Sequence, residues 1–124
     1  MPIVPMIAAR NAVQALEFYQ KVFDAKIVEG PYTDANGKVD HSEISIGGNS
    51  VMVADEQPGH NRTPDSLGGT SVLFLLPVPD FDRTHDLAIQ SGANLVRPVS
   101  TLPDGQRLAK LQDPYGHIWM IHGK

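Results

Sequence analysis

Residues 92–122 read GANLVRPVSTLPDGQRLAKLQDPYGHIWMIH, and this stretch is the second copy of a pattern that begins near residue 24. Three landmarks of the stretch each lie 68 positions after a counterpart: Ala93 after Ala25, Gly105 after Gly37, and Gly116 after Gly48. Landmarks that recur at one offset indicate an internal repeat. The sequence therefore predicts two structural units of the same kind.

The first unit, about residues 1–56, has the pattern of a strand, a helix and three further strands. Asn11 is a suitable cap for the helix, with Gln14 as its capping-box partner. The pair Asn36-Gly37 is a strong hairpin signal. The pattern predicts a helix to about residue 22 and strands at 2–9, 25–31, 38–46 and 50–55.

The second unit, about residues 69–124, follows a connector over 57–68 that is rich in Pro, Gly, Asn and Asp. We expect its helix to run from Asp80 or Asp82 to about Ser91, with Gly92 just beyond its end. Strands are predicted near 70–78, 94–101, 106–112 and 117–122.

The element order β-α-β-β-β, twice, predicts an α+β fold in one domain over residues 1–124. A sheet that carries helices on one face buries that face and leaves the other free. We expect the two tandem βαβββ units to form a cupped, half-barrel mixed sheet with the helices on its outer face. Its concave face would then hold a small-molecule site.

Composition excludes several classes of function. Of the 124 residues, 41% are hydrophobic and 19% charged, which is typical of a globular protein. The net charge is −4 and the 10 basic residues are scattered, so we expect no nucleic-acid binding. The chain has no Cys, and its longest apolar run, Val72 to Val78, is too short to cross a bilayer. Its first residues lack the features of a secretory signal, so a soluble, cytoplasmic protein is expected.

The repeat resembles the vicinal oxygen chelate superfamily, which includes glyoxalase I, bleomycin-resistance proteins, fosfomycin-resistance enzymes and extradiol dioxygenases. Two segments carry most of the resemblance: ALEFYQKVFDA at 15–25 and DPYGHIW at 113–119. HSEISIGG at 41–48 is similar to the PhnB-like branch in particular. The resemblance implies the cupped fold over the whole chain and a homodimer, and leaves open whether paired units come from one chain or two.

Metal-dependent members of this superfamily hold a divalent ion with His, Gln or Glu side chains on four strands. Carried over by resemblance, the four positions fall at Val4, at Val53 or Met52, at Leu73, and at Met120. Ser71 is the only polar candidate near the third. None of these side chains is a usual ligand of such ions, so we expect no metal cofactor.

Three other residues are candidates for chemistry. His41 and Glu43 lie two apart on a predicted strand and therefore share a face, where a His beside a carboxylate can act as a general base. His122 shares the parity of Met120, which places it near the mouth of the cup. The competing interpretation of His41 and Glu43 is a solvated strand face, and that of His122 is a surface residue near a frayed C-terminus. Arg107 and Lys110 could contact an anionic ligand, although strand cations are usually solvated.

Three functions remain open from the sequence. The first is a metal-independent binding protein of the bleomycin-resistance kind, which sequesters a planar or amphipathic small molecule in an apolar cup. The second is a divergent glyoxalase-like lyase or isomerase that uses His41, Glu43 or His122 as a base. The third is a regulatory domain without a strong ligand. The predicted lining of the cup consists of Val4, Met6, Val53, Ser71, Leu73, Leu75, Ile118 and Met120.

Overall fold

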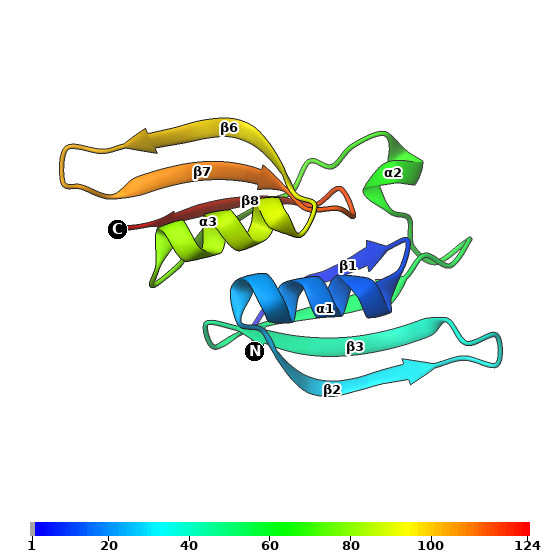
Figure 1. Ribbon diagram of the computed structural model, residues 1–124. Helices are drawn as coiled ribbons and strands as arrows, with labels where there is room; N and C mark the ends of the chain where they lie inside the picture. The colour runs from blue at the N-terminus through cyan, green and yellow to red at the C-terminus, as the bar shows by residue number, and fades with distance from the viewer. Residues whose placement is uncertain (1) are drawn as a thin grey trace. The chain divides into compact units, whose positions relative to one another are not determined.

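The computed structural model describes residues 2–124, which divide into two compact units, Met1–Gly68 and Gly69–Lys124. Each unit contains one four-stranded mixed sheet and one long helix (Figure 1). The α+β fold with a repeated βαβββ order, predicted from the sequence, is confirmed. No helix within the described part of the chain is both long and apolar enough to span a membrane.

The first unit has the sheet order β1-β4-β3-β2, in which β1 pairs parallel with β4 and the other pairs are antiparallel. Its helix α1 covers one face of the sheet, where Ile7, Ile44 and Val53 are almost fully buried. The elements are β1 (Met6–Ala9), α1 (Ala12–Phe23), β2 (Lys26–Thr33), β3 (Val39–Ile46) and β4 (Asn49–Asp55).

Helix α1 starts where the sequence predicts. Asn11 is its N-cap, and the Asn11 side chain accepts a hydrogen bond from the Gln14 amide at 3.1 Å. Asp55, at the end of β4, accepts hydrogen bonds from the backbone N–H groups of Ala12 at 2.8 Å and Val39 at 2.7 Å. This carboxylate therefore joins the start of the helix to the start of β3.

The second unit repeats this arrangement, with the sheet order β5-β8-β7-β6 and one parallel pair, β5 with β8. Helix α3 has Asp80 as its N-cap and contacts β7 and β8, on the face where Leu111, Trp119 and Ile121 are buried. The elements are β5 (Leu73–Pro77), α3 (Phe81–Gln90), β6 (Asn94–Thr101), β7 (Arg107–Gln112) and β8 (Ile118–Gly123).

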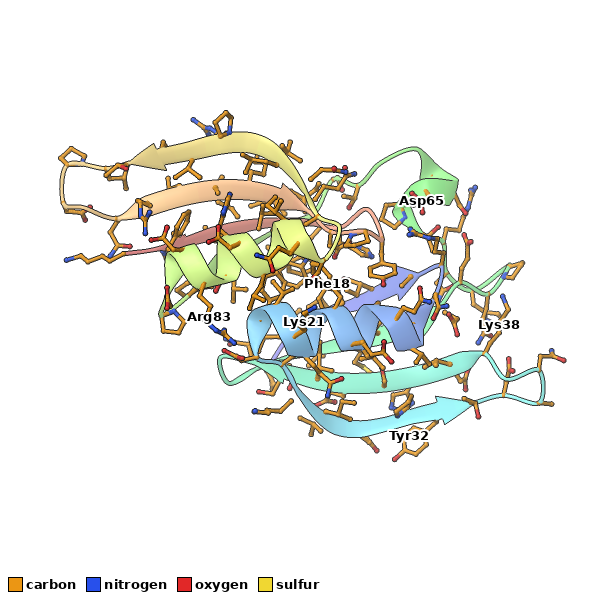
Figure 2. All side chains as sticks on the ribbon, viewed as in Figure 1. Phe18, Lys21, Tyr32, Lys38, Asp65 and Arg83 are labelled. Carbon is orange, nitrogen blue, oxygen red and sulfur yellow. The ribbon has the colours of Figure 1, made fainter. Side chains whose placement is uncertain are left out.

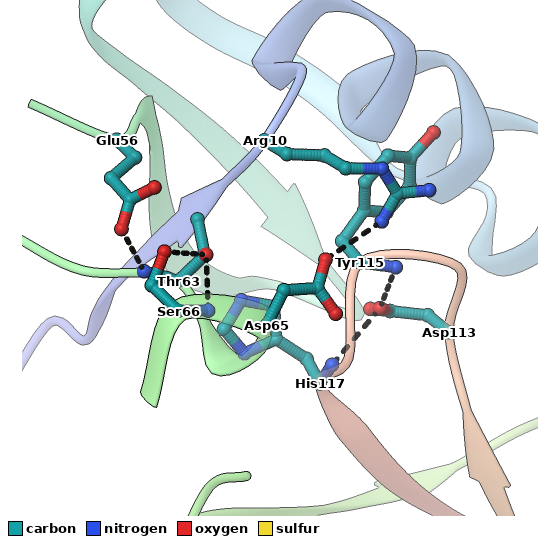
Figure 3. A network of polar contacts seen from close by, with 8 residues as sticks. All are labelled: Arg10, Glu56, Thr63, Asp65, Ser66, Asp113, Tyr115 and His117. Atoms are coloured by element: carbon teal, nitrogen blue, oxygen red, sulfur yellow. Dashed lines mark hydrogen bonds and ion pairs between the residues drawn. The ribbon is translucent and has the colours of Figure 1, made fainter. Parts of the chain in front are cut away.

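The DPYG turn before β8 is structural. The Asp113 carboxylate accepts hydrogen bonds from the backbone amides of Tyr115 and His117, at 2.9 and 3.0 Å (Figure 3), and from Trp119 Nε1 at 2.9 Å. The Trp119 ring stacks on Phe74 at a centroid distance of 4.6 Å and is 2% exposed. His117 and Trp119 therefore belong to the turn and the core of the unit.

One predicted boundary is wrong, and the connector contains a helix that the sequence did not predict. The first strand begins at Met6, because Pro2 and Pro5 have no N–H to donate to a ladder; the Pro5 carbonyl still accepts from the Met52 amide at 2.9 Å. The stretch 57–68 contains a short helix, α2 (Pro64–Leu67), whose N-cap Thr63 accepts from the Ser66 amide. This connector belongs to the first unit, since the Thr63 amide donates to Glu56 at 3.1 Å (Figure 3).

Candidate functional site

Each sheet has one face that its own helix does not cover, which we call the open face. On the first unit, strand register places Met6 beside Met52, Met52 beside Glu43, and Glu43 beside Glu29. Directly paired residues on neighbouring strands lie on the same face. These four residues therefore form one row across the open face, which is apolar at β1 and β4 and acidic at β3 and β2.

The open face of the second unit contains an equivalent row with the opposite charge. Leu75 pairs with Met120, Met120 with Lys110, and Lys110 with Arg97. The apolar end of the row is accessible, since Leu75 is 63% exposed and Met120 is half-buried. This row is therefore apolar at β5 and β8 and basic at β7 and β6.

The remaining predicted lining residues divide between the two sides of the sheets. Leu73 pairs with Ile118, so these two extend the apolar end of the second open face. Val53 lies on the opposite side of its sheet, beneath α1 and fully buried, so its prediction as a lining residue is wrong. Met52 occupies the open-face position instead. Val4 and Ser71 lie on exposed segments just before β1 and β5.

His41 lies on the first open face, and its carboxylate partner is Glu29 of β2. The distance from His41 Nε2 to Glu29 Oε2 is 3.8 Å, and the His41 side chain is 35% exposed. Tyr32, labelled on β2 in Figure 2, packs against the His41 ring at a centroid distance of 5.1 Å and donates from its hydroxyl to Glu29 at 3.2 Å. The negative charge of Glu29 raises the pKa of the Tyr32 hydroxyl.

Glu43 lies on the same open face as His41 but has a different partner. The Ser50 hydroxyl donates to Glu43 Oε2 at 3.1 Å. The sequence pairs His41 with Glu43 by their spacing, whereas the structure brings His41 to Glu29. The base-and-carboxylate arrangement available for proton transfer is thus His41–Glu29, with Tyr32 beside it.

His122 lies on the second open face, in the row formed by Pro77, His122 and Leu108. Its direct neighbours in this row are apolar, so neither of them orients the imidazole as a base. The other strand cation of interest, Arg107, is engaged elsewhere: it donates to Asp82 at 2.6 Å and lies over the Phe81 ring. This hydrogen bond and the charge of Arg107 lower the pKa of Asp82.

The residues at the four strand positions do not fit a divalent metal ion. On the open faces these positions are occupied by Met52, Leu73 and Met120, and the fourth, Val4, is also apolar. Hard divalent cations take oxygen and imidazole ligands, which thioethers and alkyl groups do not supply. Within residues 2–124 no three His, Asp or Glu side chains are grouped as a metal site would require.

Comparison with known proteins identifies the family of this chain. Residues 4–121 match the glyoxalase/bleomycin resistance protein/dioxygenase superfamily. The chain belongs to this superfamily. One relative, the uncharacterized protein Rv0887c of Mycobacterium tuberculosis, is 36% identical over 121 residues, which cover 94% of this chain and 71% of the relative. The family resemblance predicted from the repeat and the DPYGHIW segment is therefore confirmed.

Several solved structures share the fold at low sequence identity. TioX from Micromonospora is 23% identical with a TM-score of 0.71, covering 98% of this chain and 97% of that one. The fosfomycin resistance protein FosX from Mesorhizobium loti is 18% identical with a TM-score of 0.68, covering 100% and 91%. A PhnB protein from Bacillus cereus is 21% identical with a TM-score of 0.67, covering 98% and 96%. These likenesses establish the glyoxalase fold.

Sequence reasoning missed Glu29, Tyr32 and Arg97 as members of the open faces. Glu29 and Tyr32 lie on either side of register shifts in β2, and Arg97 lies between two such shifts in β6. Alternation along a strand predicts a side chain's face only where the register is regular. The sequence shows these side chains but not their cross-strand partners: Glu29 lies opposite Glu43, Tyr32 opposite His41, and Arg97 opposite Lys110.

Proposed function

We propose that this superfamily member is a metal-independent binding protein that sequesters a planar or amphipathic small molecule on its open sheet faces. The observation that carries the proposal is the exposure of large apolar side chains there: Met6 is 49% exposed, Leu73 41% and Leu75 63%. Exposed apolar side chains that adjoin one another, as Leu73 and Leu75 do on β5, are typical of interaction sites. The polarizable thioethers of Met52 and Met120 suit flat aromatic ligands.

The missing metal ligands support the same proposal. A metal-dependent mechanism uses the ion to polarise an oxygen or to activate water, and Val4, Met52, Leu73 and Met120 supply no donors for such an ion. We expect elemental analysis of protein purified in the presence of a chelator to find no stoichiometric divalent metal. About one Ni, Zn, Mn or Fe per chain would contradict the proposal.

A neutral apolar probe tests binding directly. N-phenylnaphthylamine (NPN) fluoresces when it enters an apolar site, and we expect saturable binding to the wild-type protein. Met120→Leu, which nearly conserves volume, should change the binding free energy by less than about 1.5 kcal/mol. Met120→Glu should abolish binding, because it places a carboxylate at the centre of the apolar surface.

The matched control for this substitution is Ile89→Glu, which adds the same charge at a 40% exposed position on α3. Ile89→Glu should bind NPN like the wild type. Equal loss in both variants, or tight binding by Met120→Glu, would contradict a site on the open face. Met120→Glu should remain folded, since the position is half-buried and Lys110 lies opposite.

The second candidate function is a glyoxalase-like lyase or isomerase, favoured by the proximity of His41 and Glu29. A His held 3.8 Å from a carboxylate and open to solvent has the arrangement of a general base. The test is turnover of a 2-oxoaldehyde with a thiol by the wild type and by His41→Gln. Loss of turnover in His41→Gln supports an enzyme that uses His41 as its general base. Turnover that survives the substitution excludes His41 as that base.

The finer assignments within the superfamily are also proposals. A role in antibiotic resistance is supported by the likeness to a protein named for fosfomycin resistance, and a PhnB-like branch by the likeness to a PhnB protein. Expression in a susceptible bacterial host, with the Met120→Glu variant as control, tests the first. Equal drug susceptibility with and without the wild-type protein would contradict it.

A further inference from the structure

We infer that the open face of the second unit binds an amphipathic anion: a flat or extended apolar body on Leu75 and Met120, with its anionic group between Lys110 and Arg97. The inference rests on the proposed binding function and specifies the class of its ligand. The anionic group belongs to the class of carboxylates, phosphonates and sulfonates.

The first support is the position of the two cations. Lys110 and Arg97 are direct partners on β7 and β6, and both lie in the row that continues into Met120 and Leu75. Like charges directly opposite one another on neighbouring strands destabilise a sheet. An anion placed between the two side chains would relieve this repulsion.

The second support is that the protein itself does not supply this counter-charge. Among residues 2–124, neither Lys110 nor Arg97 has a carboxylate within ion-pair distance. The Asp side chains of the second unit have other partners: Asp82 pairs with Arg107, Asp86 with His85, Asp80 caps α3, and Asp104 and Asp113 accept from backbone amides in their turns. Arg107 is neutralised in this way, while Lys110 and Arg97 are not.

The third support is the contrast with the equivalent row of the first unit. There the like charges are Glu43 and Glu29, and each has a polar neighbour: the Ser50 hydroxyl for Glu43, and His41 with the Tyr32 hydroxyl for Glu29. The acidic row is therefore satisfied within its own unit. The basic row alone has unsatisfied charge beside an exposed apolar surface, which is the pattern that an amphipathic anion matches.

Arginine and lysine divide the recognition between them. The guanidinium of Arg97 presents paired N–H donors that match a carboxylate or a phosphonate, and the Lys110 ammonium adds a point charge. The apolar body would lie on Leu75, which is 63% exposed, and on its partner Met120, with the 41% exposed Leu73 two residues before Leu75 on β5. The apolar surface and the two cations contribute separately, so a ligand that carries both an apolar body and an anionic group binds more tightly than one that has only the apolar body.

Two matched fluorescent probes separate the charge from the apolar surface. Anilinonaphthalene sulfonate (ANS) carries an aromatic body and a sulfonate, while NPN has the same rings without the anion. We expect the wild-type protein to bind ANS about tenfold more tightly than NPN at low salt, since charge-assisted hydrogen bonds are the stronger ones. High salt should weaken ANS binding and leave NPN binding unchanged.

The variant is the double substitution Arg97→Gln and Lys110→Gln, and the control is Lys21→Gln on the exposed surface of α1 (Figure 2). The double variant should lose the preference for ANS, with an increase in the ANS Kd of about tenfold and no change for NPN. Lys21→Gln should behave like the wild type. Thermal melting should show that the double variant is at least as stable as the wild type, because the substitution removes a like-charge repulsion.

The outcomes distinguish this inference from the proposed function. NPN binding without a preference for ANS, or a preference that the double variant keeps, overturns the anion site and leaves the binding function standing. ANS binding that depends on Arg97 and Lys110 without any NPN binding supports the anion site and overturns the apolar one. Binding of neither probe overturns both.

Competition then distinguishes the kinds of anion. Octanoate and octylphosphonate share an alkyl body and differ in their anionic groups. Displacement of ANS by either supports the inference, and the more potent competitor identifies the preferred group. Failure of both to displace ANS from the wild-type protein counts against an anion site at Lys110 and Arg97.

Discussion

Asp113 stabilises the turn before β8 by accepting hydrogen bonds at both oxygens of its carboxylate. One oxygen accepts from the Tyr115 and His117 amides and the other from the Trp119 indole, and the residue is 3% exposed. A buried donor that loses its acceptor costs about 1–3 kcal/mol. This residue therefore has a structural role, although it lies in the segment that carries most of the family resemblance.

Asp113→Asn should lower the free energy of unfolding by about 1–3 kcal/mol, because an amide can accept from only one side and leaves a donor unpaired. Urea denaturation measures the loss. The control is Asp104→Asn in the exposed hairpin turn, where Asn can still accept from the Gln106 amide. Equal stability of both variants would mean that the Trp119 hydrogen bond contributes nothing.

Glu56 should make the stability of the folded protein decrease at acid pH. Hydrogen bonds from the Ser66 hydroxyl and the Thr63 amide lower the pKa of the Glu56 carboxyl. A carboxylate whose pKa is lower in the folded state stabilises the protein above its unfolded pKa, and loses this contribution as pH falls through the folded value. Wild type should therefore melt higher than Glu56→Gln at neutral pH, and the difference should shrink as pH falls below about 4.3.

The measurement is the melting temperature of both proteins over a pH series from neutral to strongly acidic. A Glu56→Gln variant whose difference from wild type stays constant over the series would show that ionised Glu56 does not stabilise the connector. The contribution belongs to the first unit, since Glu56, Thr63 and Ser66 all lie within Met1–Gly68.

At the scale of elements, the helix starts are predictable because capping is a local interaction. Asn11 and Asp80 both cap their helices by accepting from the amide three residues on, at 3.1 and 3.2 Å. The side chain and its partner lie within one turn, so the sequence contains the whole interaction. The strand-to-helix order of each unit follows from such signals together with the hairpin turns.

Asn11→Ala should cost about 1 kcal/mol of stability, and Asn11→Ser should restore most of it. Chemical denaturation checks both values. Glu17→Ala, at an exposed position within α1, is the control and should change stability by less than about 0.5 kcal/mol. An Asn11→Ala variant as stable as wild type would show that Asp55, through the Ala12 amide, suffices to start the helix.

At the scale of the whole molecule, the edge strands favour association. β2 and β6 are edge strands whose residues are all exposed, among them Val28 at 58% and Val96 at 52%. Exposed strand edges with apolar side chains are usually covered in stable proteins. We therefore expect a homodimer, formed either with or without exchange of units between the two chains.

Light scattering at micromolar concentration should give twice the 13.5 kDa mass of the chain. Val28→Lys on β2 and Val96→Lys on β6 test the two edges separately. The substitution on the edge that forms the interface should shift the protein toward the monomer. A wild-type monomer at this concentration would contradict the expectation.

The sequence by itself determined the repeat, the βαβββ order of each unit, the start of α1 and the family. These follow from turn residues, capping residues and apolar periodicity, which act over a few positions along the chain. Where β3 and β8 alternate regularly, the alternation matches burial: Ile44, Ile46 and Trp119 are buried.

Only the tertiary structure decided which residues share an open face. Val53 and Met52 are neighbours in sequence, and pairing with β1 and β3 puts Val53 beneath α1 and Met52 on the open face. Glu29 and Arg97 were placed by register shifts in β2 and β6. The physical reason is that side chains alternate with a period of two, so a shift of one residue in pairing moves a side chain to the other face.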